Sequence, residues 1–326
     1  MTGPTPAAAA RARRQEELAL RTVASMDQLW QYVRGRRITA TWRQVADRML
    51  VVLVAAKLAS AQGAQEYVTE SVTEQGGRSD PGGRVNPEAF AGWAADGRAL
   101  TSLLELPRIT ALTAIAAGTP ESLALQAGRA QLLRIASSEV ADAGRLASGV
   151  AIASNRACTG YVRVIAGGAC SRCVILAGVV YGSAVAFQRH PHCHCVHQPA
   201  IRRNRTPLTT PRSYFNSLSQ ADQDRTFGLA GARAIRDGGD IFAIVNARRG
   251  VYTTTAYGRQ VRATSEGITR RGAFYQSERR RAVASGRATR ATFRLRTPRL
   301  LPEEIYELAE THDEVLAMLR RFGYLR

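Results

Sequence analysis

Cysteine and histidine residues gather in one short stretch of the chain, residues 170–199. This stretch holds four of the five cysteines and four of the five histidines in a sequence of 326 residues. Five of these side chains form two hooks separated by sixteen residues: Cys170 and Cys173, then His190, Cys193 and Cys195. A two-residue spacing lets both members of a pair face one ion, and a tetrahedral zinc site needs four such ligands. The pattern predicts a structural zinc centre.

The ligand set leaves alternatives open. We expect three cysteines and one of two further residues to bind zinc: Cys170, Cys173 and Cys195, with either His190 or Cys193. Disulfides would suit a secreted protein, but the first residues contain no apolar run after their basic residues, so we expect no secretory signal. Reduced thiols without metal are the other alternative. Cys158 lies outside the cluster, and we expect it to be a small buried side chain.

The chain is strongly basic. It carries 45 basic against 26 acidic residues, a net charge of +19 and a pI near 10.9. Residues 201–300 hold most of this excess, with 21 arginines and six acidic residues. Such a charge favours a polyanionic partner. Because Lys57 is the only lysine, the choice of arginine over lysine reflects codon usage as readily as function.

Residues 270–300 form the most basic segment, in which aromatic residues alternate with arginines. Arginine forks match phosphate geometry, and neutralising several phosphates gives salt-dependent binding without sequence preference. An acidic protein partner or a solvated surface remains the alternative. The candidate nucleic-acid-binding residues are Arg270, Arg271, Arg279, Arg280, Arg281, Arg287 and Arg290.

The first half of the chain has helical periodicity. Apolar residues recur at three- and four-residue steps from about residue 14 to 34 and from 41 towards 73, and a further helix is expected from residue 121 towards 153. The longest strongly apolar run, residues 49–56, is too short to cross a bilayer. We therefore expect a soluble protein that does not contact membranes.

The middle and the last part of the chain differ from this pattern. Residues 161–165 alternate as in a strand, with 179–181 as its partner. Ser219, Asp240 and Thr311 are expected to cap short helices in the last part. The sequence predicts a mainly α (α+β) protein with three parts: a helical docking unit (1–157), a β-containing zinc knuckle (158–200) and an arginine-rich helical unit (201–326).

The cysteine-histidine segment resembles a known family. C-S-R-C-x2-L-A-G-x2-Y at 170–181 and F-x-R-H-P-x-C-x-C at 187–195 are similar to the signature of bacteriophage MuF-like minor head proteins from actinobacterial viruses. Residues 214–250 and 266–272, with the LLPEEIYELA ending, resemble the same group. The resemblance covers roughly residues 160–326, whereas residues 1–157 match only in being helical.

The resemblance implies a minor capsid protein of the virion, in the phage head interior or at the portal vertex. Such a protein would be made in the host cytoplasm, join the prohead, and act in head assembly and in DNA packaging or release. The implied partners are the portal protein, the major capsid or scaffold protein, and packaged double-stranded DNA. The five cysteine and histidine positions are carried over as the metal unit.

Related proteins are often labelled capsid maturation protease, so this is the alternative function. The residues offer little for it: no G-x-S-x-G motif is present, and the 170–199 segment contains no carboxylate to act as a base beside zinc. Ser183 with a nearby histidine, or Cys158 with one, would be the nucleophile, while His312 is expected at a helix surface. We therefore favour a structural role over enzyme activity and keep the protease as the alternative.

Overall fold

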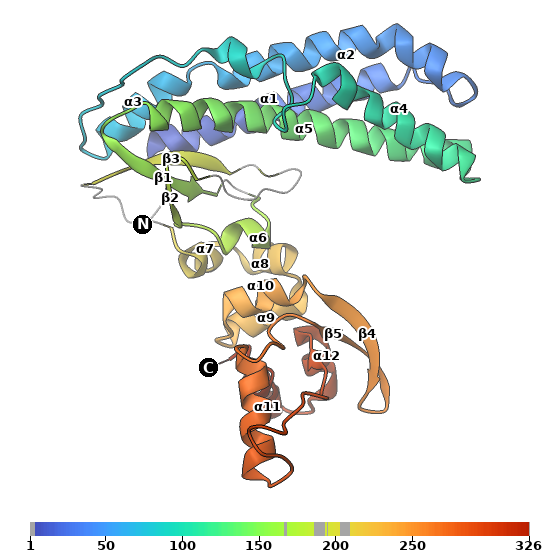
Figure 1. The fold of residues 1–326 in the computed structure, drawn as a ribbon, viewed down its shortest axis with the longest axis vertical. Helices are drawn as coiled ribbons and strands as arrows, with labels where there is room; N and C mark the ends of the chain where they lie inside the picture. The colour runs from blue at the N-terminus through green and yellow to red at the C-terminus, as the bar shows by residue number, and fades with distance from the viewer. Residues whose placement is uncertain (1–3, 166–167, 186–192, 194, 203–208, 326) are drawn as a thin grey trace. The chain divides into compact units, whose positions relative to one another are not determined.

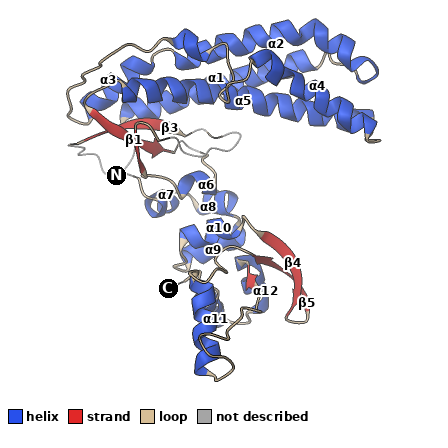
Figure 2. Ribbon diagram, in the orientation of Figure 1, coloured by secondary structure: helices blue, strands red, loops and turns tan. Residues whose placement is uncertain are grey.

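The computed structural model of the chain is mainly helical, with two small antiparallel sheets (Figures 1 and 2). It describes residues 4–165, 168–185, 193, 195–202 and 209–325. The chain divides into two compact units: residues 1–169 with 177–209, and residues 170–176 with 210–326. The expected mainly α (α+β) class is confirmed. The expected boundaries near residues 157 and 200 stay a prediction.

Long helices form most of the first unit. These are α1 (Pro6–Trp30), α2 (Ile38–Ala61), α3 (Ala64–Glu74), α4 (Leu100–Ala116) and α5 (Glu121–Ala153), with short 3-10 turns η1 (Gly35–Arg37) and η2 (Pro87–Phe90). The α5 helix runs along α1, α2 and α4 (Figure 1). It has the extent expected from sequence. The expected helix over 41–73 is wrong in one respect, because Gly63, at φ 69°, separates α2 from α3.

The core of the first unit uses the apolar stripes that the sequence indicates. Met26 and Trp30 of α1 and Trp42 and Met49 of α2 are all buried, and the two tryptophan rings meet edge to face at 6.0 Å. The close approach of α1 to α5 requires a small residue on α5, because a Cβ atom at Gly128 would lie only 2.8 Å from the Trp30 ring. Burial of these large side chains stabilises the unit by roughly 1.5–3 kcal/mol each.

Two buried cations link the helices of the first unit. The Arg11 guanidinium donates to the carbonyls of Ser60 (2.6 Å) and Gln62 (2.8 Å), at the end of α2, and burial lowers its pKa to about 10. Lys57 of α2 forms an ion pair with Glu139 of α5, and both side chains are almost fully buried. Each cation therefore reaches an acceptor on another turn or helix, as burial of a charge requires.

A three-stranded sheet completes the first unit, with strands in the order β2-β1-β3, all antiparallel. They are β1 (Cys158–Val164), β2 (Val180–Gly182) and β3 (Val196–Ile201). Tyr161 lies opposite Tyr181 on one side and Pro199 on the other. The expected pairing of 161–165 with 179–181 is confirmed. The third strand was not expected, because HQP in its centre does not alternate.

The second unit contains short helices around a small aromatic core. They are α6 (Ser171–Val174), α7 (Pro211–Ser217), α8 (Gln220–Phe227), α9 (Leu229–Arg236), α10 (Ile241–Ala247), α11 (Ala273–Ala284), α12 (Pro302–Leu308) and α13 (His312–Arg321). Ser219, Asp240 and Thr311 accept hydrogen bonds from first-turn amides, so these three predicted caps are confirmed. Phe274 and Phe322 pack with ring centroids 5.4 Å apart.

A second sheet, which the sequence pattern did not predict, lies in this second unit. Strands β4 (Val251–Ala256), β5 (Arg259–Thr264) and β6 (Arg299–Leu300) pair antiparallel in that order. Tyr257 (φ 56°) and Gly258 (φ 75°) form the turn between β4 and β5. Two consecutive positive φ angles are typical of a two-residue type I′ hairpin. The last part of the chain, expected to be an arginine-rich helical unit, therefore also contains a sheet.

The Lys57–Glu139 pair yields a test of the first unit. Glu139→Gln leaves a buried ammonium without its carboxylate, and we expect a loss of about 3–5 kcal/mol in the free energy of unfolding. The three tryptophans, Trp30, Trp42 and Trp93, all lie in the first unit, so their fluorescence during urea unfolding reports on that unit alone.

A matched double variant provides the control. Lys57→Met with Glu139→Leu removes both charges at similar volume, and we expect it to recover most of the lost stability. A Glu139→Gln protein that unfolds at the same urea concentration as the wild type would contradict this description of the pair.

Candidate metal centre

Three of the five predicted metal ligands lie together in the structure. The ligand atoms of Cys173, Cys193 and Cys195 all lie within 4.8 Å of one another, and all three residues are buried. Tetrahedral zinc with Zn–S bonds of about 2.3 Å requires sulfur atoms roughly 3.8 Å apart. The three cysteines are therefore close enough to bind a metal ion, and their soft donor set fits zinc.

Cys173 comes from a single helical turn that Cys170 begins. Cys170 is the N-cap of α6, and its carbonyl accepts a hydrogen bond from the Cys173 amide (2.9 Å). Cys170 is exposed and is not a member of the three-sulfur group among the described residues. The turn therefore directs one cysteine of the first hook into the group.

Cys193 and Cys195 are held through their backbone by a buried arginine of α5. The Arg145 Nη1 atom donates to the carbonyl of Cys193 (2.6 Å) and to that of Cys195 (3.2 Å). Asp142, one turn earlier on α5, accepts from Arg145 Nη2 at 2.7 Å and so fixes the guanidinium. A buried, charge-assisted contact of this kind fixes the second hook against the helix.

A second buried arginine contacts the sulfur itself. Arg163 of β1 is only 2% exposed, and its Nη2 atom lies 3.5 Å from the Cys193 Sγ atom. A nearby guanidinium stabilises the thiolate, which is the form that binds metal. The sequence alone did not indicate Arg145 or Arg163, because each acts on a segment at least thirty residues away and no local pattern marks such a contact.

The strand after the second hook is also anchored firmly. The Tyr67 hydroxyl of α3 donates to the His197 carbonyl (2.6 Å), and the Tyr161 ring stacks on the His197 imidazole at 4.1 Å. Gln75 donates to the Pro199 carbonyl at 2.9 Å. The second hook therefore leads directly into the well-held β3 strand. The predicted ligand His190, together with His192 and His194, lies outside the described residues.

The three donors of the group are all cysteine sulfur atoms. Among the described residues, the three-sulfur group contains no aspartate or glutamate. A hydrolytic zinc site needs a water-bearing position and a nearby base, commonly a carboxylate. All five cysteines are thiols rather than disulfides in the structure.

Two residues considered for nucleophilic chemistry have unsuitable surroundings. Burial raises the pKa of the Cys158 thiol to about 11, so the reactive thiolate is scarce at neutral pH. Ser183 and His197 line one pocket of about 240 Å³, but its other described lining residues include no carboxylate to orient the imidazole. His312 is exposed at the start of α13, as expected.

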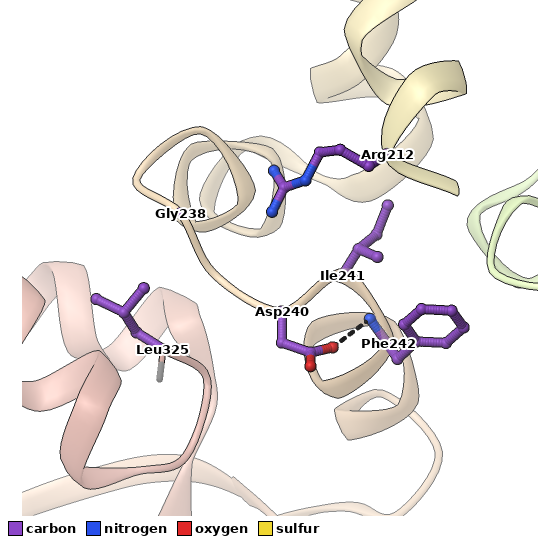
Figure 3. Close-up of a pocket in the computed structure, with 6 residues that line it drawn as sticks. All are labelled: Arg212, Gly238, Asp240, Ile241, Phe242 and Leu325. Atoms are coloured by element: carbon purple, nitrogen blue, oxygen red, sulfur yellow. Dashed lines mark hydrogen bonds between the residues drawn. The ribbon is translucent and has the colours of Figure 1, made fainter. Parts of the chain in front are cut away.

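A larger pocket in the second unit has a structural arginine at its wall. Figure 3 shows this pocket, of about 490 Å³, with Arg212, Asp240 and Phe242 among its lining residues. The Arg212 guanidinium donates to the carbonyls of Ile235 (2.8 Å) and Gly239 (3.0 Å). The Asp240 carboxylate accepts from the Phe242 amide (2.9 Å). Both charged groups are thus engaged in holding the ends of α9 and α10.

The predicted nucleic-acid-binding arginines lie on and around α11 in the second unit. Arg279 is half-buried, and the other six are exposed: Arg270, Arg271, Arg280, Arg281, Arg287 and Arg290. Of these seven, only Arg281 forms an ion pair within the described residues, with Glu278 at 3.8 Å. The segment therefore presents a cationic surface.

The fold and the site together define a mainly helical protein with a candidate cysteine metal centre. The family model described as VG15 protein matches residues 1–221, more than half of the chain, and the chain belongs to this family. The match suggests a phage protein. It includes the helical first part, where the MuF-like resemblance was weakest.

No curated protein and no solved structure matches the chain. Within the described residues, no helix has the length and apolar character needed to span a bilayer.

The metal centre makes a direct prediction. We expect purified protein to hold about one zinc per chain. Cys173→Ser and Cys193→Ser should each lower the bound zinc measured by mass spectrometry of the metal, because each removes a sulfur of the buried group. Since metal binding is coupled to folding, both variants should also unfold at lower temperature.

Cys158→Ser is the matched control, because Cys158 is a cysteine outside the three-sulfur group. Its zinc content should equal that of the wild type. Cys170→Ser tests whether the exposed cysteine supplies the fourth ligand. Equal zinc content in the wild type, Cys173→Ser and Cys193→Ser would rule out the proposed site.

Proposed function

We propose that this chain is a MuF-like minor capsid protein of a phage head, which acts in prohead assembly and in DNA packaging or release. Membership of the VG15 protein family, which suggests a phage protein, supports the setting. The cationic surface around α11 is the observation that carries the function, because a head protein beside packaged DNA meets a dense array of phosphates.

The composition of this surface supports contact with a phosphate backbone. Exposed guanidinium groups on α11 and the segments flanking it lie within one unit, and they are little offset by acidic residues. Glu278, the one acidic residue between 270 and 300, is bound by Arg321 at 3.0 Å. Arginine is suited to bidentate phosphate contacts, and contacts of this kind carry no sequence information.

The metal unit has a structural role in this proposal. Three buried sulfurs with no carboxylate among them suit a zinc ion that stabilises the fold. The chain's own residues prepare that site: Arg145 fixes the backbone of the second hook, and Arg163 favours the thiolate of Cys193.

The helical first unit is proposed to contact the portal protein and the major capsid or scaffold protein. Large apolar side chains are exposed on its helices, including Leu20 (61%), Val51 (67%) and Leu123 (53%). Single exposed apolar residues are ordinary, but several on long helices are suited to helix packing in an assembly. This proposal assigns the protein to the virion, in the head interior or at the portal vertex.

The composition of finished particles tests the assembly function. We expect mass spectrometry of purified particles of the phage that encodes this chain to detect it at a few copies per particle. The maturation-protease alternative predicts specific cleavage of scaffold or capsid protein by the purified chain, abolished by one point substitution. Absence from particles, or such cleavage, would refute the structural role.

Binding to double-stranded DNA tests the cationic surface. We expect the affinity to fall steeply with added salt. The triple variant Arg279→Gln, Arg280→Gln, Arg281→Gln should reduce the slope of log affinity against log salt by about 0.9 for each phosphate that is no longer neutralised. A fluorescence anisotropy titration at several salt concentrations measures both quantities.

A triple variant elsewhere in the second unit controls for net charge. Arg225→Gln, Arg249→Gln, Arg320→Gln removes the same charge from exposed positions, and we expect little change in the slope. An affinity of the wild type that does not respond to salt would exclude the proposed DNA contact.

A further inference from the structure

A pocket of about 450 Å³ in the second unit is lined by the end of α11 and the segment that follows it. Arg287, Arg294 and Arg296 all contribute to its wall, together with Thr292 and Phe293. We propose that this pocket is a binding site for the phosphate groups of a polyanion, with these three arginines as its ligands. Its assignment to DNA rests on the proposed function, whereas its phosphate chemistry does not.

The three guanidinium groups have donors to offer a ligand. Arg287 uses Nε to reach the Ser285 hydroxyl (2.8 Å), and Arg294 uses Nη1 to reach the carbonyls of Phe293 (3.0 Å) and Ala291 (3.3 Å). Within the described part of the chain, the Nη atoms of Arg287, the Nη2 atom of Arg294 and the whole Arg296 group make no other hydrogen bond. Local contacts thus restrain two arginines and leave several N–H donors for an anion.

The one carboxylate and one hydrogen-bond-accepting carbonyl of the described pocket wall both already have donors. Glu278 lines the pocket, but its carboxylate accepts from Arg321 at 3.0 and 3.3 Å, and its side chain is only 11% exposed. The carbonyl of Ala282, near the end of α11, accepts from the amides of Arg287 (2.9 Å) and Ala288 (3.3 Å). The three arginines therefore dominate the charge of the pocket.

The wall that carries the arginines is held in place. Phe293 is 7% exposed and packs edge to face on Tyr275 of α11, with ring centroids 5.2 Å apart. Thr289 and Thr292 close the intervening turn, since each hydroxyl accepts from the other residue's amide (2.9 and 3.2 Å). A site restrained before binding loses less entropy on binding an anion. Concavity, three arginines in one pocket wall and a restrained wall segment distinguish this pocket from an open basic surface.

Phosphate groups could reach the pocket from a nucleic acid backbone or from a small polyphosphate. Both offer the same ligand atoms, oxygens that accept bidentate hydrogen bonds from arginine. Inorganic pyrophosphate is the probe for the chemistry of the pocket, and a mixed-sequence DNA duplex is the probe for the backbone. Comparing the two affinities distinguishes binding in the pocket from binding to the wider cationic surface around α11.

The experiment uses the full-length protein and a triple variant, Arg287→Gln, Arg294→Gln, Arg296→Gln. Calorimetric titration with pyrophosphate at low salt should give binding to the wild type that is about tenfold weaker or more in the variant, because three charged donor groups are removed. The control variant Arg225→Gln, Arg249→Gln, Arg320→Gln has the same net charge as the pocket variant. It should bind pyrophosphate as tightly as the wild type does. Far-ultraviolet circular dichroism of all three proteins checks the fold.

Equal pyrophosphate affinity in all three proteins, or no binding by the wild type, would overturn the pocket. If the pocket variant also binds the DNA duplex more weakly than the control, the backbone is its source of phosphate. If only pyrophosphate binding is lost, the pocket stands as a polyphosphate site. Failure of the wild type to bind DNA would refute the proposed DNA contact without affecting the pyrophosphate result.

Discussion

Burial of cations is the constraint on which the first unit depends. Arg11, Lys57 and Arg145 are buried in this unit, and a charge removed from water is tolerated only with acceptors around it. Arg11 uses the carbonyls that end α2, Lys57 uses Glu139, and Arg145 uses Asp142 and the backbone of the second hook. Apart from the Arg145–Asp142 pair within α5, these contacts join segments far apart in the chain, so the helices and the second hook are positioned together.

The same constraint connects the fold to the candidate metal centre. Arg145 and Arg163 come from α5 and β1, whose places are determined by helix packing and strand pairing. Through these two arginines, the helical core positions the backbone and one sulfur of the second hook. A metal that binds there would therefore meet a site with part of its geometry already prepared, rather than a loop that it must order from the start.

The sequence predicts the long helices well and the second sheet poorly. The stripes containing Met26, Trp30, Trp42 and Met49 repeat over many turns, so one misassigned position does not change the result. The sequence of the 251–264 hairpin does contain a local indication of strands, because β-branched residues alternate on both sides of Tyr257-Gly258. The helical patterns before and after this segment favoured helix instead. The break at Gly63 was missed because the apolar stripe continues on both sides of it.

The candidate site was predictable in its ligand types and not in its arrangement. Cysteine spacing indicated which side chains gather, and Cys173, Cys193 and Cys195 do so, while Cys170 lies outside the group in the described residues. The supporting arginines, and the pocket that Arg294 and Arg296 line, depend on contacts between distant segments. Charge composition alone could identify a basic segment, but only folded geometry separates a concave anion site from a uniformly basic face.

The burial of Lys57 has a practical consequence for mapping the neighbours of this protein. It is the only lysine in the chain, and it is 1% exposed. Amine-directed cross-linkers therefore find no lysine on the folded surface, and carboxyl- or guanidine-directed reagents are the appropriate choice. For the same reason, acylation of Lys57 is a site-specific chemical reporter of opening in the helical unit.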